Sequence, residues 1–423
     1  MSTHHRVAGA TPAWAKVPPL VPFSLVPLFA AVALRPAIDA LYEVNAVKYV
    51  YMFLVFFGVL LARAGMKFST FPLAERNDEQ RALAVMGWTA AYFWYLVVLL
   101  LSYNGSLQDC FKITSPFLIF ALLLLVPGRW FQVAAVVSSV LIILANAALL
   151  PTSFGWIWWG DVKTFKGFYY FKTDLAYSLC FAVLICAYAQ RYRLTLSLVA
   201  LIAIAAVQVV LCNSRINYLT FALVTVFIGL KGGMKPSTIV RMTALTAIAA
   251  GAFFLLFDSK KFLSFDTSNV HAFTQGRDLV WDILIKEGLS QYSPLEWLFG
   301  RGLFADTLIF AGEHSQGEAH NAHNEFLHLL TTQGLVGVGL YLTLWLFVFR
   351  QTPGTSKEPW QAGTREIAFF LLLIQSITAA ISLSALKTWP VIAIMLLLRS
   401  GRADPARTLP TPGGVRTAVH GAR

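Results

Sequence analysis

The chain has 423 residues, of which 57% are hydrophobic and only 13% are charged, and its mean hydropathy is +0.65. Soluble domains carry about 25% charged residues, so this composition excludes an ordinary soluble protein and indicates a polytopic membrane protein. The net charge of +12 does not indicate a nucleic-acid partner, because the basic residues are scattered between apolar segments rather than clustered on one soluble face.

Apolar runs along the chain predict an all-α fold of about twelve transmembrane helices. Before the first apolar run, segment 1–19 is polar and has no cleavage-site pattern, so it is predicted to be a cytoplasmic tail rather than a signal peptide. Each run approaches the length that crosses a bilayer, and turn-forming or basic residues separate neighbouring runs. The predicted helices cover 20–34, 46–62, 83–102, 113–126, 130–150, 175–189, 194–211, 216–230, 239–257, 326–349, 366–383 and 386–398.

The basic residues predict the orientation of these helices. With both termini in the cytoplasm, the inside segments hold 20 of the 33 basic residues and 6 of the 21 acidic ones. The outside segments hold the other 13 basic and 15 acidic residues, so the inside sums to +14 and the outside to −2. Lysine and arginine favour cytoplasmic loops, and this division therefore predicts that both termini are cytoplasmic.

Two outside segments are too long to be simple turns. Segment 151–174 is rich in aromatic residues and lysine, while 258–325 is the one stretch of soluble-like composition. Helical periodicity around 277–289 predicts that this second segment is folded, and long loops of this kind are often functional. The predicted domains are a membrane bundle of about nine helices (1–257), a periplasmic loop (258–325), C-terminal membrane helices (326–398) and a cytoplasmic tail (399–423).

Two arginines in outside segments are candidates for anion binding. Arg215 follows Asn213 and Ser214 in a short turn, where arginine is disfavoured unless it has a function; the alternative is that it reaches the lipid headgroups. Arg277 begins the amphipathic stretch that includes Trp281, and its planar guanidinium suits two hydrogen bonds to a phosphate. The alternative for Arg277 is a solvated arginine at the start of a helix.

Histidines are dense at the end of the long loop, where His314, His320, His323 and His328 precede or begin a predicted helix. An imidazole titrates near neutral pH, so a histidine here suits general acid–base catalysis. Metal binding is a competing interpretation, but the spacing does not match H-E-x-x-H. The four cysteines also lack metal-ligand spacing. A third alternative is that the histidines cap a helix at the headgroup level.

Several short motifs occur in a fixed order along the second half of the chain. They are Ser214-Arg215, Gly276-Arg277 with Trp281, Gly300 with Gly302, His323 to Leu327, and Gly334 to Gly337. This order resembles the O-antigen ligase and O-antigen/exopolysaccharide polymerase superfamily of bacterial envelope glycan assembly. The resemblance spans roughly 210–345 by motif and the whole chain by helix count.

The resemblance implies an inverting, metal-independent glycosyl transfer, without a cofactor, at the periplasmic face of the bacterial inner membrane. The donor would be a glycan on undecaprenyl diphosphate. Arg215 and Arg277 would hold the diphosphate and His323 would activate an acceptor hydroxyl. Cationic groups suit an anionic leaving group, and a neutral imidazole suits proton removal. Further substrate-binding candidates are His320, Arg301 and Glu325.

The acceptor distinguishes two activities within this superfamily, and both remain open. Phe171-Lys172-Thr173-Asp174 resembles the Lys-Asn segment of exopolysaccharide polymerases, which makes Lys172 a substrate-binding candidate, although Thr173 departs from the pattern. A polymerase would use a sugar acceptor, whereas a ligase would use lipid A core. Other envelope glycan assembly proteins are possible partners. A transporter or flippase of lipid-linked glycans is the alternative function, disfavoured because the predicted helices contain few charged residues near their centres.

Overall fold

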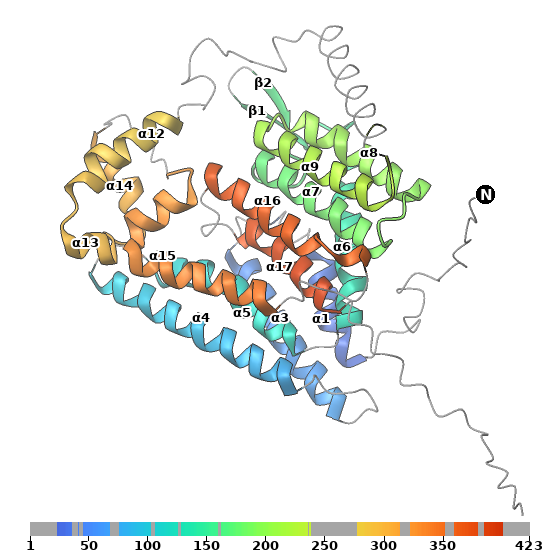
Figure 1. The fold of residues 1–423 in the computed structure, drawn as a ribbon, viewed down its shortest axis with the longest axis horizontal. Coiled ribbons are helices and arrows are strands. Elements are labelled where there is room, and N and C mark those ends of the chain that lie inside the picture. Colours follow the sequence, from blue (N-terminus) through green and yellow to red (C-terminus); the bar gives the residue numbers. More distant parts are fainter. Residues whose placement is uncertain are drawn as a thin grey trace, which may run out of the picture.

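The computed structural model describes residues 23–35, 41, 45–67, 76–102, 106–125, 128–159, 162–235, 237, 277–313, 322–351, 359–379 and 385–400 (Figure 1). It is about 81% helical, which confirms the all-α prediction. The described helices outside the long loop are α1 (Val26–Ala33), α3 (Asn45–Lys67), α4 (Arg76–Ser102), α5 (Leu107–Leu124), α6 (Gly128–Ala147), α7 (Lys172–Ala189), α8 (Leu196–Leu211), α9 (Arg215–Lys231), α15 (Glu325–Gln351), α16 (Thr364–Thr378) and α17 (Ala385–Ser400). Single 3₁₀ turns cover Phe23–Leu25 and Pro359–Gln361.

These eleven helices coincide with eleven of the twelve predicted apolar runs; the remaining run, 239–257, lies outside the described residues. Among the described helices, four are long and apolar enough to cross a membrane. They are the helical segments Glu79–Leu101, Leu107–Leu124, Lys172–Ala189 and Glu325–Gln351. The chain therefore has the helix content and hydropathy of a membrane protein.

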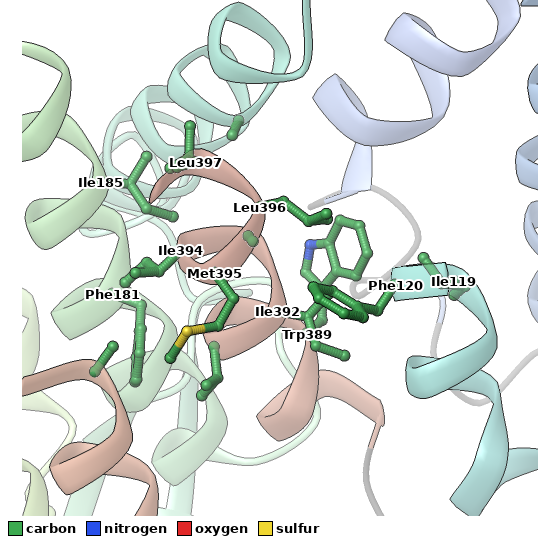
Figure 2. Close-up of a cluster of buried hydrophobic side chains, with 14 of the residues drawn as sticks. Ile119, Phe120, Phe181, Ile185, Trp389, Ile392, Ile394, Met395, Leu396 and Leu397 are labelled. Atoms are coloured by element: carbon green, nitrogen blue, oxygen red, sulfur yellow. The ribbon is translucent and has the colours of Figure 1, made fainter. Parts of the chain in front are cut away.

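The helix α7 is enclosed by four other helices. Its residues from Leu175 to Tyr188 are buried without a break, as expected of a helix that is apolar on every side and surrounded by others. It contacts α6, α8, α9 and α17. The last of these, α17, fits between α7 and α5, and Figure 2 shows its side chains between Phe181 of α7 and Phe120 of α5.

A β-hairpin connects α6 to α7. Its strands, β1 (Trp156–Trp159) and β2 (Val162–Phe165), pair antiparallel, and Trp158 faces Lys163 across the ladder. The indole of Trp156 donates a hydrogen bond to the carbonyl of Leu150, 3.0 Å away, which ties the hairpin to the end of α6. The aromatic residues noted in the predicted outside segment 151–174 also favour a strand.

Part of the long loop is folded against α15, as the periodicity around 277–289 predicts. It contains α12 (Arg277–Ile283), a π-helical turn (Leu284–Gly288), a 3₁₀ turn (Leu289–Gln291), α13 (Pro294–Phe299) and α14 (Ala305–Glu313). Val280 and Leu284 form a small apolar cluster with Ala322, and Ile309 and Leu327 pack against it. These short helices lie beside α15 at one side of the bundle (Figure 1).

The long helix α15 is broken at Gly334, whose φ of 62° and ψ of −170° are not helical. The break leaves the carbonyl oxygens of Thr331 and Thr332 without helical partners. The backbone N–H of Arg301 donates to Thr331 at 3.1 Å, and that of Gly302 donates to Thr332 at 2.9 Å. The loop therefore supplies the hydrogen bonds that the broken helix cannot make itself.

The glycines at this contact allow the two backbones to meet. A Cβ built on Gly334 would stand 2.5 Å from the backbone nitrogen of Gly300, and one on Gly300 would overlap the peptide between Thr332 and Gln333. Both glycines also have positive φ. The sequence motifs Gly-x-Gly and Gly-Leu-Val-Gly are thus complementary halves of one close approach between the loop and α15.

Replacing Gly334 by alanine is expected to destabilise the fold by about 2–4 kcal/mol, from left-handed strain and overlap with the loop. Gly339 is a matched control in the same helix, because a Cβ there meets nothing within 4 Å. The apparent melting temperature of purified protein in detergent should fall for Gly334→Ala and stay level or rise slightly for Gly339→Ala. Equal melting temperatures for the two variants would contradict this account of the contact.

Candidate functional site

The predicted base, His323, stands between two firmly held neighbours at the start of α15. Its φ is +46°, in the left-handed region, and its side chain is partly exposed. The preceding residue, Ala322, is fully buried. Its backbone N–H donates to Asp306 at 2.9 Å, and its carbonyl accepts a hydrogen bond of 2.8 Å from the indole of Trp281. Side chains of α14 and α12 therefore hold both polar groups of the residue next to His323.

The following residue, Asn324, caps α15 and joins it to α16. Its side-chain oxygen accepts from the backbone N–H groups of Phe326 and Leu327, at 3.0 and 3.1 Å. Its side-chain amide donates to the carbonyl of Ile377, 3.2 Å away, near the end of α16. An asparagine that accepts the first free N–H groups of a helix fixes where that helix begins. The position of His323 is thus fixed from both sides.

Arg277 belongs to the same assembly as His323. It is the first residue of α12, one helical turn before Trp281, so the two side chains project from one face of that helix. The indole of Trp281 contacts the backbone beside His323. Burial lowers the pKa of Arg277, although a guanidinium remains charged at any physiological pH. Arg277 is therefore a partly buried cation on the helix whose Trp281 holds the peptide next to the predicted base.

Arg215 lies at the N-terminal end of α9, just as His323 lies at the N-terminal end of α15. It is partly exposed, begins the helix, and follows a turn in which Asn213 has a φ of +48°. Two residues further on, the buried Asn217 accepts a 2.8 Å hydrogen bond from Gln375 of α16. Gln375 is two residues from Ile377, the partner of Asn324. The helix end that carries Arg215 and the one that carries His323 are therefore joined through a single segment of α16.

Lys172 lies beside this junction. It is the first residue of α7 and is buried. The carbonyl of the next residue, Thr173, accepts a 3.2 Å hydrogen bond from the amide of Asn217. The sequence candidates Lys172, Arg215 and His323 are thus at the same end of α7, α9 and α15, with α16 connecting them.

Arg301 makes contacts of a structural kind. Its Nε donates to Glu296 at 2.6 Å, and its guanidinium lies 4.4 Å from the ring centre of Tyr292. The hydrogen bond from Arg301 lowers the pKa of Glu296 to about 2. Glu296 also completes a capping box with Ser293 at the start of α13. This arrangement favours stabilisation of the loop by Arg301 over contact with a substrate.

Glu325 is also placed in the interior. It is 1% exposed, at the first position of α15. Its carboxylate interacts with the side chain of Tyr341, which lies beyond the break at Gly334. This contact favours a role in holding the two halves of α15 together. The remaining candidate, His320, lies outside the described residues.

No sequence motif singles out Asp306 or predicts a separate role for His328, yet the two form a buried pair. The ring Nδ1 of His328 lies 2.8 Å from a carboxylate oxygen of Asp306, and both side chains are 1% exposed. Burial by itself raises the pKa of Asp306, but the charge and hydrogen bond of His328 outweigh it and lower the pKa overall. Twenty-two positions separate the two residues, so only the folded loop brings them together.

The described residues contain no group of three histidine, cysteine or acidic side chains that would hold a metal ion. A small, mostly apolar cavity among the described helices lies elsewhere, between α1, α6, α7 and α17, where Ser138, Ser139 and Ser178 supply its polar atoms. What distinguishes the candidate site is that Lys172 and Arg215 are the first residues of α7 and α9, and that His323 lies two residues before the start of α15. Neither a protein-family model nor a curated protein sequence matches this chain.

Proposed function

We propose that this chain is an inverting, metal-independent membrane glycosyltransferase that moves a glycan from undecaprenyl diphosphate to an acceptor sugar hydroxyl, as a repeat-unit polymerase or an O-antigen ligase. One observation carries the proposal. The three residues expected to act on substrate, Arg215, Arg277 and His323, come from separate parts of the chain and lie at helix ends that hydrogen bonds tie together. Their chemistry suits an anionic leaving group and a hydroxyl nucleophile.

The reaction assigns one task to each group. The imidazole of His323 takes the proton of the acceptor hydroxyl as its oxygen attacks the anomeric carbon of the donor sugar. The bond between that carbon and the diphosphate breaks, and its electron pair leaves with the lipid diphosphate. Arg215 and Arg277 stabilise the negative charge that develops there. Attack opposite the leaving group inverts the anomeric configuration.

The chain is proposed to act at the periplasmic face of a bacterial inner membrane, with about twelve spans, cytoplasmic termini and the 258–325 loop outside. The charges of +14 inside and −2 outside, counted from the sequence, support this orientation. A cysteine replacing the exposed Ser290 should react with a membrane-impermeant thiol reagent in cells with a permeabilised outer membrane. The native cysteines are buried and give little background. Labelling that requires disruption of the inner membrane would reverse the orientation.

Transport of lipid-linked glycans is the competing function. Transporters place ionisable residues near the centre of the membrane, where they bind substrate or ions. In the four described spans the lysine, arginine, aspartate and glutamate residues lie near the ends, as at Lys172 and Asp174 in α7 and at Glu325 and Arg350 in α15. This distribution favours chemistry at the membrane surface.

The glycan profile of a deletion strain tests the proposal and separates its two forms. Single unpolymerised repeats on the lipid carrier are expected for a polymerase, and finished chains stranded on the carrier for a ligase. Each profile should return to normal with the wild-type chain and stay abnormal with His323→Ala. Restoration by His323→Ala, or accumulation of donor on the cytoplasmic side alone, would contradict glycosyl transfer.

A further inference from the structure

We infer that Asp306 is a positioning residue for His323, acting through the peptide of Ala322. The inference rests on the proposed function, because it assigns a task to Asp306 within the same reaction. The inference depends on the two hydrogen-bond partners of one carboxylate oxygen of Asp306, Oδ2. That atom accepts the N–H of Ala322 at 2.9 Å and lies 2.8 Å from Nδ1 of His328.

This sharing locks the loop to the first turn of α15. His328 is within the helix, whereas Ala322 precedes it, and His323 lies between the two points that Asp306 holds. The other oxygen of Asp306 accepts the backbone N–H of Thr307 at 3.0 Å, which fixes the carboxylate to its own helix, α14. Both acceptor atoms are therefore used, and the carboxylate has little freedom to turn.

A residue with positive φ needs such support. Left-handed backbone costs a residue with a side chain about 1–2 kcal/mol, so His323 keeps it only while its surroundings hold it there. Asp306 and Trp281 form hydrogen bonds with the backbone of Ala322, the residue before His323, and Asn324 caps the helix after it. Loss of one of these hydrogen bonds allows the imidazole to move relative to the acceptor hydroxyl, and a displacement of about 1 Å costs roughly 100-fold in rate.

His328 serves Asp306 in this arrangement rather than the substrate. It is 1% exposed, so an acceptor sugar cannot reach it without a rearrangement. A buried carboxylate needs hydrogen-bond donors, and the Nδ1–H of His328 supplies one to Asp306. An asparagine at position 328 places an amide N–H close to where Nδ1 stood, and therefore preserves this donation.

The test compares variants of purified, monodisperse protein by turnover and by donor-lipid binding. Asp306→Ala is expected to lower kcat about 10- to 100-fold while the dissociation constant for the donor lipid stays within about twofold, because Arg215 and Arg277 are untouched. Trp281→Phe, which keeps an aromatic ring but removes the indole N–H and part of the ring volume, should also lower kcat, but by less. His328→Asn should keep most of the turnover.

Tyr292→Phe is the matched control. The Tyr292 hydroxyl donates to the carbonyl of Thr331 at 2.8 Å, so this loss also loosens the docking of the loop on α15, but away from His323. It should lower the melting temperature and leave kcat unchanged. If Tyr292→Phe lowers kcat as much as Trp281→Phe does, or if Asp306→Ala retains full kcat, the positioning role is overturned. If His328→Asn is as inactive as His323→Ala, His328 itself is the base and the inference fails.

Hydrogen exchange separates this inference from the proposed function. The amides of 322 and 323 should exchange faster in Asp306→Ala than in Tyr292→Phe, whatever the activity of the chain. Unchanged protection of these amides would overturn the positioning role even if glycan transfer is established. Faster exchange in Asp306→Ala, combined with a wild-type chain that transfers no glycan, would instead support the contact between Asp306 and Ala322 and remove the proposed function.

Discussion

Replacing His323 by alanine is expected to lower glycan transfer by about 10²–10⁴-fold, the usual contribution of a general base, while donor-lipid binding survives. The imidazole is partly exposed, between Ala322, whose backbone is held by α12 and α14, and Asn324, whose side chain is bonded to α16. Without it, the acceptor hydroxyl must attack before losing its proton. The measurement is turnover beside the dissociation constant for the donor lipid in the same purified preparation.

His323→Asn is the control for the backbone. Alanine is strained at a φ of +46°, whereas asparagine adopts left-handed backbone more readily and offers no basic nitrogen for this step. The two variants should lose transfer to a similar extent if the base is what matters. Near-normal turnover in either one would contradict the assignment and make His320 the next candidate.

Replacing Arg215 or Arg277 by alanine is expected to lower transfer by about 10²–10³-fold, because each loses a charge-assisted contact at a developing anion. Unlike the histidine variants, these should also weaken donor-lipid binding. Lysine should restore activity only in part, since an ammonium cannot reproduce the two parallel hydrogen bonds of a guanidinium. Both the fall in turnover and the rise in the dissociation constant are measurable with one labelled donor.

Lys286→Ala is the matched control for removing a positive charge from the loop. Its side chain is 68% exposed and is paired with Asp282 on the surface beyond α12. It should leave transfer and binding nearly unchanged, because such exposed pairs contribute little. An equal loss in Lys286→Ala would mean that the general charge of the loop, rather than two specific guanidinium groups, attracts the donor.

Hydropathy was enough to predict most of the fold. A long run of apolar residues forms a helix both in lipid and in a protein interior of this kind. In either environment there is no water, so the backbone groups must hydrogen-bond to one another. That argument located α7, α8, α9 and α15 to within a few residues. It did not reveal the hairpin of 156–165, since an aromatic segment at a membrane boundary fits an irregular loop equally well.

The site was predictable only in part. Local motifs identified Arg215, Arg277 and His323, whose chemistry is legible from residue type and neighbourhood. The connection between the helices that carry them depends on hydrogen bonds such as that of Asn324 to Ile377, which no local pattern contains. For the same reason Asp306, which pairs with His328 across 22 positions, was not predicted as a site residue. The hydrogen bond from Arg301 to Glu296 was not predicted either. Contacts between distant segments follow from packing, which one sequence does not display.

The most direct measurement of the central claim uses purified protein in liposomes with a labelled glycan on undecaprenyl diphosphate and excess EDTA. Glycosyl transfer predicts that the label moves to an acceptor glycan with inverted linkage, that one lipid diphosphate is released for each transfer, and that His323→Ala stops both. Passage of the intact lipid-linked glycan across the bilayer, with no release of lipid diphosphate, would contradict the account and identify the chain as a transporter.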